Sequence, residues 1–131
     1  MPKIPVEKMK TTYIMKKIWE MKSRQIRERD ADERGYIKCF TCSAIKLISE
    51  MDAGHYIHGK HPGTWLLDRN LHSQCDICNR HHSGRREVYA LELEARYGHG
   101  ILQELAKAHT GRSTWRRTEL YKVYKELKSN L

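Results

Sequence analysis

The chain has 131 residues, of which 25 are Lys or Arg and 16 are Asp or Glu, giving a formal net charge of +9. This length favours one domain, and the positive charge favours a polyanionic partner, most often nucleic acid, over a basic protein without one. No apolar stretch approaches the roughly 18 residues of a membrane span. We therefore expect no membrane segment, no secretory signal and a cytoplasmic protein in a reducing compartment.

The N-terminal part is predicted to form a loose arm over residues 1–10, followed by an amphipathic helix. Thr11 or Thr12 can cap this helix, which should end at Gly35. Apolar residues recur at helical spacing on one face, and charged residues populate the opposite face. The apolar residues are Ile14, Ile18 and Met21, with Met15, Trp19 and Ile26 beside them.

The central part is expected to contain short strands. One strand over residues 36–42 is followed by an ambiguous segment, 43–50, and a second strand over residues 51–58. A His-Pro-Gly turn at residues 61–63 then predicts a return strand at residues 65–67. Together these segments predict a β-hairpin in the middle of the chain.

Helices are predicted over residues 75–97, with a break near 83–84, over residues 101–109, and after a cap at Ser113 or Thr114. Apolar stripes mark the first and the last of them. The stripes are Val88, Leu91 and Ala95 in the first helix, and Leu120, Tyr124, Leu127 and Leu131 in the last. The terminal helices either pack onto the central unit or form a dimer interface, and both alternatives bury the same stripes.

These elements indicate an α+β, mainly helical fold in a single domain. Residues 1–34 supply the N-terminal arm and helix, residues 35–98 the core, and residues 99–131 C-terminal helices that pack on the core.

Four cysteines form two Cys-x-x-Cys pairs, Cys39 with Cys42 and Cys75 with Cys78. Each such turn presents two thiolates to one ion, and Zn²⁺ prefers four ligands in a tetrahedron. In a reducing compartment the pairs favour metal over a disulfide, the alternative being free or redox-active thiols. The spacing predicts one closed structural zinc site that stabilises a small core.

A Gly-His pair, Gly54-His55, and two asparagines, Asn70 and Asn79, lie between and beside the cysteines. A metal-dependent nuclease needs a base, a divalent cation and a positive surface. His is the natural base near neutral pH, and amide or carboxylate oxygens can hold Mg²⁺ or Mn²⁺. As alternatives, His55 is a structural histidine near zinc, and Asn79 caps a helix.

These residues resemble those of the HNH (His-Me finger) endonucleases, and the four-cysteine form is similar to phage junction-resolving endonucleases of the endonuclease VII type. Over residues 35–98 the chain is more closely similar to the NinG/Rap family of lambdoid phage recombination proteins. The pattern consists of Ala53-Gly54-His55-Tyr56, Asn70-Leu71, Gln74-Cys75, Cys78-Asn79 and Ser83-Gly84, together with Cys39 and Cys42.

The resemblance implies a zinc-stapled ββα-metal core (HNH, treble-clef-like) flanked by helices. It implies that His55 is the general base, that Asn70 holds the hairpin connection in shape, and that Asn79 binds the catalytic Mg²⁺ or Mn²⁺. The implied activity is hydrolysis of phosphodiesters in branched DNA, such as Holliday junctions or flaps, in the cytoplasm of a phage-infected host cell. Paired cuts at a four-way junction lead us to expect a homodimer.

One position departs from the pattern of these nucleases. Most carry Asp, Glu or His directly before the base, where that residue ligates the cation, and here the position is Gly54. Asp52 points to the same side of an extended strand, so it is either a cation ligand or a solvated residue. Other possible ligands are His72, His81 and His82, each of which also fits a surface histidine or a phosphate contact.

Basic residues near turns and helix starts are candidates for contacts with DNA phosphates. They are Lys60, Arg69, Arg80, Arg85 and Arg86, with a further group at Arg112, Arg116 and Arg117. No element resembles a base-reading helix, so recognition of shape is expected. Tyr56 and Trp65 are candidates to wedge into a branch, although the hairpin core suits them better.

Two rival functions share parts of this pattern. A non-catalytic, zinc-stabilised DNA-binding module explains the cysteines and the charge, but leaves the arrangement of His55, Asn70 and Asn79 to chance. An HNH nuclease for ordinary duplex or single-stranded DNA shares the chemistry and differs in its substrate.

Overall fold

The computed structural model describes residues 4–131, so the first three residues of the predicted arm lie outside it. The fold is mainly helical with two small antiparallel sheets, which confirms the predicted α+β class. The helices are α1 (Thr11–Asp30), α2 (Arg86–Tyr97), α3 (Ile101–Ala108) and α4 (Arg117–Ser129). The strands are β1 (Tyr36–Lys38), β2 (Ile45–Leu47), β3 (Met51–His55) and β4 (Leu71–Cys75). No helix among residues 4–131 has both the length and the apolar content to span a membrane.

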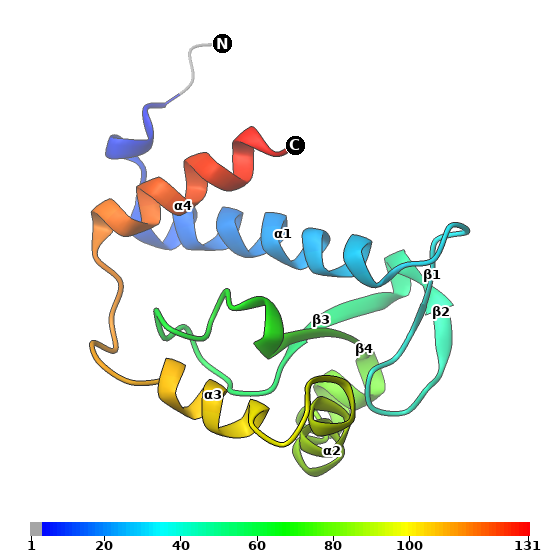
Figure 1. Cartoon of the computed structure of the whole chain (residues 1–131). Coiled ribbons are helices and arrows are strands. Elements are labelled where there is room, and N and C mark those ends of the chain that lie inside the picture. The colour runs from blue at the N-terminus through cyan, green and yellow to red at the C-terminus, as the bar shows by residue number, and fades with distance from the viewer. Residues whose placement is uncertain (1–3) are drawn as a thin grey trace.

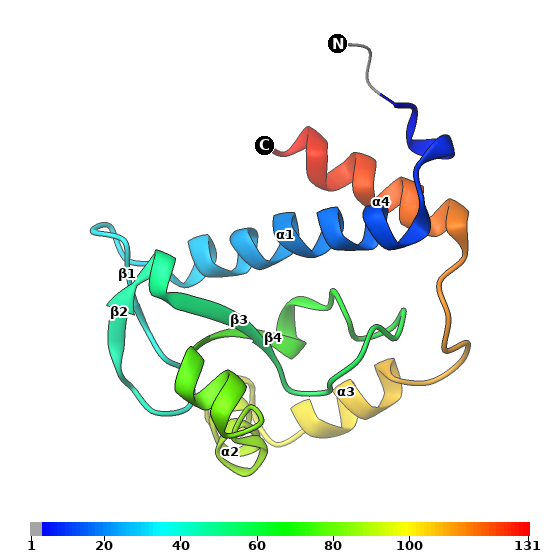
Figure 2. The same cartoon turned by 180° about the vertical axis from the view of Figure 1, so that it is seen from behind.

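The long helix α1 runs through the middle of the molecule. Figure 1 shows α4 on one side of α1 and the β3–β4 hairpin on the other, with α2 and α3 beyond the hairpin. The view from behind in Figure 2 shows the same layers, with the β1–β2 ribbon at one end of α1. Helix α1 therefore joins two hydrophobic clusters, one shared with α4 and one shared with the hairpin.

The apolar stripes of the two terminal helices bury one another. Ile14 and Ile18 of α1 and Leu120 of α4 are fully buried in one cluster, together with Trp65. Burial of an aliphatic side chain of this size contributes about 1.5–3 kcal/mol. Most of the two predicted stripes is thus buried within the chain where α4 packs on α1, whereas Leu131 lies beyond the end of α4 and is exposed.

The C-terminal end of α1 fixes the position of β4. Arg29 Nη2 donates to the carbonyl of Leu71 at 2.7 Å, and the Asp30 carboxylate accepts from the backbone N–H of Ser73 at 2.9 Å. The helix ends at Asp30, so the predicted end at Gly35 was wrong. Gly35 instead adopts a left-handed φ of 81° in the turn that leads into β1.

The return strand of the central hairpin is β4, and the predicted return strand at residues 65–67 was wrong. Strand β3 pairs antiparallel with β4, with Asp52 opposite Gln74 and Gly54 opposite His72. Residues 62–66 form turns instead, and Trp65 is buried in the cluster that α1 shares with α4.

Every residue of β4 is buried, including the three polar residues in its middle. His72 is sandwiched between two tyrosine hydroxyls, 3.1 Å from that of Tyr89 and 2.8 Å from that of Tyr97, and its ring stacks on Phe40. Burial, with the charge of Arg29 adding to it, lowers the pKa of His72 to about 3. His72 is therefore a neutral structural residue inside the fold.

The segment after β4 begins with a single π-helical turn, Ile77–His81, and α2 starts only at Arg86. The break near residues 83–84 was predicted, but the buried face of α2 was not. The predicted stripe of Val88, Leu91 and Ala95 is exposed. Tyr89 and Leu93 are buried instead and pack against α3.

Candidate metal centre and catalytic cleft

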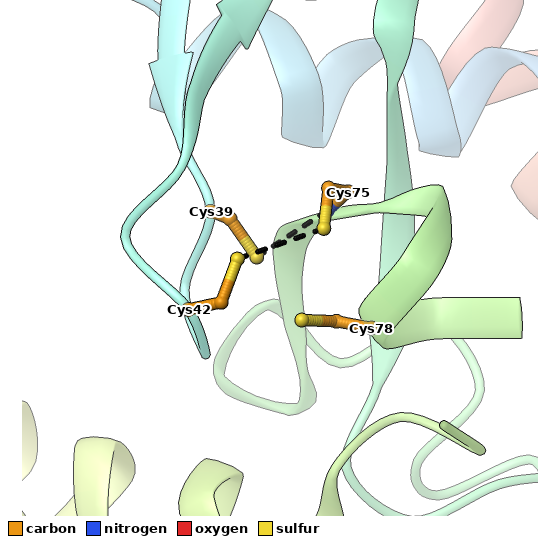
Figure 3. A group of neighbouring side chains, drawn as sticks. All are labelled: Cys39, Cys42, Cys75 and Cys78. Carbon is orange, nitrogen blue, oxygen red and sulfur yellow. Dashed lines mark hydrogen bonds between the residues drawn. The ribbon is translucent and has the colours of Figure 1, made fainter. Parts of the chain in front are cut away.

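The four cysteines converge, as their spacing predicted. Figure 3 shows Cys39 and Cys42, from the loop after β1, facing Cys75 at the end of β4 and Cys78 in the π-helical turn. All four Sγ atoms lie within 4.8 Å of one another, and those of Cys42 and Cys75 are 3.7 Å apart. A tetrahedral zinc with Zn–S bonds of 2.3 Å places its sulfurs about 3.8 Å apart. The cluster fits a structural zinc site that four thiolates close completely.

Hydrogen-bond donors reach two of the four sulfurs. The backbone N–H of Cys75 donates to Cys39 Sγ at 3.3 Å, and Arg85 Nε donates to Cys78 Sγ at 3.1 Å. Burial alone would raise the pKa of Cys39, but backbone hydrogen bonds from Cys75 and Thr41 lower it to about 6. Burial and the neighbouring thiols raise the pKa of Cys42 to about 12. Four thiolates together therefore need a cation to balance their charge.

His55 ends β3 and is held in a defined tautomer. Its Nε2 lies 2.8 Å from the backbone carbonyl of Trp65, which can only accept, so Nε2 carries the proton and Nδ1 can accept one. The ring stacks on Trp19 of α1 with centroids 4.8 Å apart. Burial lowers the pKa of His55 below its ordinary value. Burial thus favours the neutral form of the His55 imidazole.

Asn70 is fully buried and braces the loop that follows β3. Its Oδ1 accepts from the backbone N–H of Ile57 at 2.8 Å, and its Nδ2 donates to the carbonyls of Ile57 and Thr64 at 3.0 and 2.9 Å. Thr64 directly precedes Trp65, whose carbonyl holds His55. Asn70 therefore supports the segment whose Trp65 carbonyl hydrogen-bonds His55.

Asn79 lies in the π-helical turn and is oriented by Asp52. Its Nδ2 donates to Asp52 Oδ2 at 3.1 Å, while Arg80 bonds both carboxylate oxygens of Asp52 at 2.9 and 3.0 Å. The carboxylate thus has two protein partners, and Asn79 Oδ1 is left facing Gly54. Direct ligation of a cation by Asp52 stays a prediction.

A cleft of about 730 Å³ brings His55 and Asn79 together. Its lining includes Trp19, His55, His58, Lys60, Trp65 and Asn79. The sequence analysis placed Trp19 only beside the apolar face of α1, and it did not single out His58. Helical spacing from Met15 placed Trp19 beside the apolar stripe, but nothing in the sequence indicated that it would stack on His55.

The predicted DNA-contacting residues fall into two groups. Lys60 is exposed at the cleft, and Arg86 lies over the ring of Tyr56 at 4.9 Å. Four arginines have protein partners: Arg69 pairs with Glu104, Arg80 with Asp52, Arg85 with the Cys78 sulfur, and Arg86 donates to the Tyr56 carbonyl at 3.4 Å. The alternative cation ligands His81 and His82 are exposed. Trp65, a candidate to wedge into a DNA branch, is buried in the core. Contacts of the basic residues with DNA, and of His81 and His82 with a metal, stay predictions.

The chain was compared with known protein families and with curated proteins. The model of the family described as "NinG: Bacteriophage Lambda NinG protein" matches residues 3–131. Protein ninG of Escherichia phage lambda is 31% identical over 121 residues, covering 92% of this chain and 56% of the relative. Protein ninG of Escherichia phage 933W is 33% identical over 105 residues, covering 79% and 49%. Protein ninG of Salmonella phage P22 is 31% identical over 121 residues, covering 92% and 57%.

The chain thus spans about half the length of the curated relatives it matches. No solved structure matches it significantly.

Proposed function

This chain belongs to the NinG family of lambdoid phage proteins, and we propose that it is a metal-dependent endodeoxyribonuclease that cleaves branched recombination intermediates. The observation that carries the proposal is the state of His55. A neutral imidazole with Nε2 bonded to Trp65 has Nδ1 available to take a proton, and it lines the same cleft as Asn79.

We further propose that β3, β4 and the turn after Cys75 form a ββα-metal finger of the HNH type. Antiparallel pairing of β3 with β4, followed directly by a helical turn that carries Asn79, supports this assignment. The cysteine cluster supports it too, because it ties that turn to the loop after β1 and so fixes Asn79 relative to His55.

In the proposed reaction His55 Nδ1 removes a proton from the attacking water, while Asn70 keeps the Trp65 carbonyl in place. Asn79 Oδ1, with the Asp52 carboxylate beside it, suits a hard divalent cation, because both are oxygen donors. Bound Mg²⁺ or Mn²⁺ would supply positive charge against the scissile phosphate and the leaving oxygen. Lys60, at the mouth of the cleft, would hold the phosphate backbone.

Paired cuts at a four-way junction need two such clefts. We therefore propose a homodimer, because a two-fold axis places two identical clefts symmetrically on a symmetric junction.

The proposal is tested by incubating the zinc-loaded protein with a four-way junction, a flap and a linear duplex, with and without Mg²⁺. We expect Mg²⁺-dependent cutting of branched DNA that His55→Ala abolishes. Tight binding without cutting of any DNA would favour the non-catalytic binding module. Equal cutting of linear duplex would favour the general nuclease.

A further inference from the structure

Gly54 lies where two amide oxygens converge. A Cβ built on Gly54 would lie 1.9 Å from Gln74 Oε1 and 3.1 Å from Asn79 Oδ1. We call the place beside the Gly54 Cα where these two oxygens approach each other the Gly54 notch. The two oxygens lie within about 5 Å of each other, because both are close to one point. Ligands on opposite sides of Mg²⁺ are separated by about 4 Å, so this upper bound is compatible with one ion shared by both oxygens.

Gln74 Oε1 is a buried acceptor with no hydrogen-bond partner among residues 4–131. The residue itself is fully buried in β4. An amide oxygen left unsatisfied in this way destabilises the fold. A buried acceptor normally has a hydrogen-bond donor or a bound ion as its partner, and residues 4–131 supply none for Gln74 Oε1.

The orientation of the Gln74 amide is fixed by its nitrogen. Nε2 donates to Thr41 Oγ1 at 3.0 Å and to the carbonyl of Gly84 at 2.9 Å, which uses both of its protons. Rotating the amide would place Oε1 against the Gly84 carbonyl, which cannot donate. The oxygen therefore faces the Gly54 notch.

Building on the proposed nuclease function, we propose that Gln74 Oε1 is a ligand of the catalytic divalent cation, acting with Asn79 Oδ1 at the Gly54 notch. Amide oxygens are among the hard ligands that Mg²⁺ and Mn²⁺ accept. Asp52 orients Asn79, and Thr41 with Gly84 orients Gln74, so both ligands are held by surrounding hydrogen bonds. Gly54 is required because any side chain there would displace Gln74.

The proposal predicts that a carboxylate at position 54 can replace the Gln74 oxygen. Gln74→Ala removes both atoms that crowd the notch most, leaving room for a side chain on residue 54. We would measure Mn²⁺ binding to the zinc-loaded full chain by electron paramagnetic resonance of free Mn²⁺. Gln74→Ala should weaken binding by roughly ten- to a hundredfold. The double variant Gly54→Asp/Gln74→Ala should recover most of this loss.

The matched control is Gly54→Ala/Gln74→Ala, which fills the notch without an oxygen and should bind Mn²⁺ as weakly as Gln74→Ala. Equal recovery with Ala and Asp at position 54 would mean that Gln74 only braces the fold, and would overturn the proposal. Unchanged Mn²⁺ affinity in Gln74→Ala would overturn it as well. Where circular dichroism shows Gln74→Ala unfolded, Gln74→Met keeps the volume, removes the oxygen and carries the same expectation.

The outcomes separate this inference from the proposed function. Mg²⁺-dependent DNA cleavage by the wild type, together with normal Mn²⁺ affinity in Gln74→Ala, would remove Gln74 as a ligand and leave the nuclease standing. A wild type that neither binds Mn²⁺ nor cleaves DNA would overturn both.

Discussion

The cysteine cluster and the cleft are built from polar residues around the same hairpin, yet they differ in how their polar atoms are satisfied. In the cluster, four sulfurs face one another, and the Cys75 N–H and Arg85 donate to two of them. In the cleft, His55 Nδ1 and Asn79 Oδ1 are acceptors that the surrounding hydrogen bonds leave available, and the buried Gln74 Oε1 lies close by at Gly54. The sulfurs of the cluster face one another, whereas the acceptors of the cleft are available to a bound ligand.

The difference distinguishes a site suited to stabilising the fold, the cluster, from a site suited to chemistry, the cleft. Four mutually facing thiols leave no position for a substrate, so the cluster can only brace the fold. Fixed acceptors beside a neutral base can bind a cation and take a proton, but an unsatisfied buried group costs stability. The fold supports the open site because the closed site holds the adjoining turn in place.

The largest effect is expected at the closed site. Cys75→Ser should abolish zinc binding and unfold the central region, because about 10 kcal/mol or more of zinc-binding free energy is coupled to folding in such sites. Metal content by mass spectrometry and helicity by circular dichroism measure this, with the exposed Ser49→Ala as control. A folded Cys75→Ser protein with full zinc content would contradict the assignment.

A smaller loss of stability is expected from a substitution at Asn70, which braces the loop after β3. Asn70→Ala removes three hydrogen bonds and should lower the free energy of unfolding by about 2–4 kcal/mol, since buried backbone groups lose their partners. It should also lower cleavage, because the Trp65 carbonyl that orients His55 loses its support. Urea unfolding checks the first effect, with the exposed Asn130→Ala as control. Equal stability of both variants would show that Asn70 is not the brace.

The buried His72 should make stability depend on pH. Its pKa is about 3 in the fold and about 6.5 in the unfolded chain, so the unfolded chain binds more protons between these values. The free energy of unfolding therefore falls as the pH drops from 6.5 toward 3, by up to a few kcal/mol. His72→Gln should flatten this slope, and the fully exposed His99→Gln should not. Equal slopes in all three proteins would refute the neutral, buried state.

The smallest effect concerns DNA affinity. Lys60→Ala should weaken DNA binding a few-fold and reduce the salt slope by about one, as loss of one phosphate contact does. Arg69→Ala should change binding less, because Arg69 already pairs with Glu104 and lies over Tyr97. Titrations at several salt concentrations measure both variants. A larger loss in Arg69→Ala would show that the protein pairing opens on DNA.

The parts of the molecule that repeat a simple spacing could be predicted from the sequence. The two Cys-x-x-Cys pairs predicted a metal cluster, and helical spacing predicted the stripe of Ile14 and Ile18 that packs on α4. The residues His55 and Asn79 were selected as a pair, and the cleft contains both.

The errors arose where tertiary contacts satisfy polar residues. Strand β4 was missed because His72, Ser73 and Gln74 are polar yet buried, so no alternation of apolar and polar residues marks it. The buried face of α2 was misassigned because Tyr89 is held by a hydroxyl contact to His72 from another element. Gln74 was part of the family pattern, but its role had no local signal, since its hydrogen-bond partners Thr41 and Gly84 are distant in sequence.

The most direct test of the account is the rate of Mg²⁺-dependent cleavage of a four-way junction by wild type, His55→Ala and the surface control His99→Ala, each with its zinc content and DNA affinity measured. The account predicts that His55→Ala keeps zinc and binds the junction like the wild type, yet cleaves it roughly 10²–10⁴-fold more slowly, as expected for loss of a general base. His99→Ala should cleave at the wild-type rate. A zinc-loaded His55→Ala protein that cleaves the junction as fast as the wild type would contradict the account.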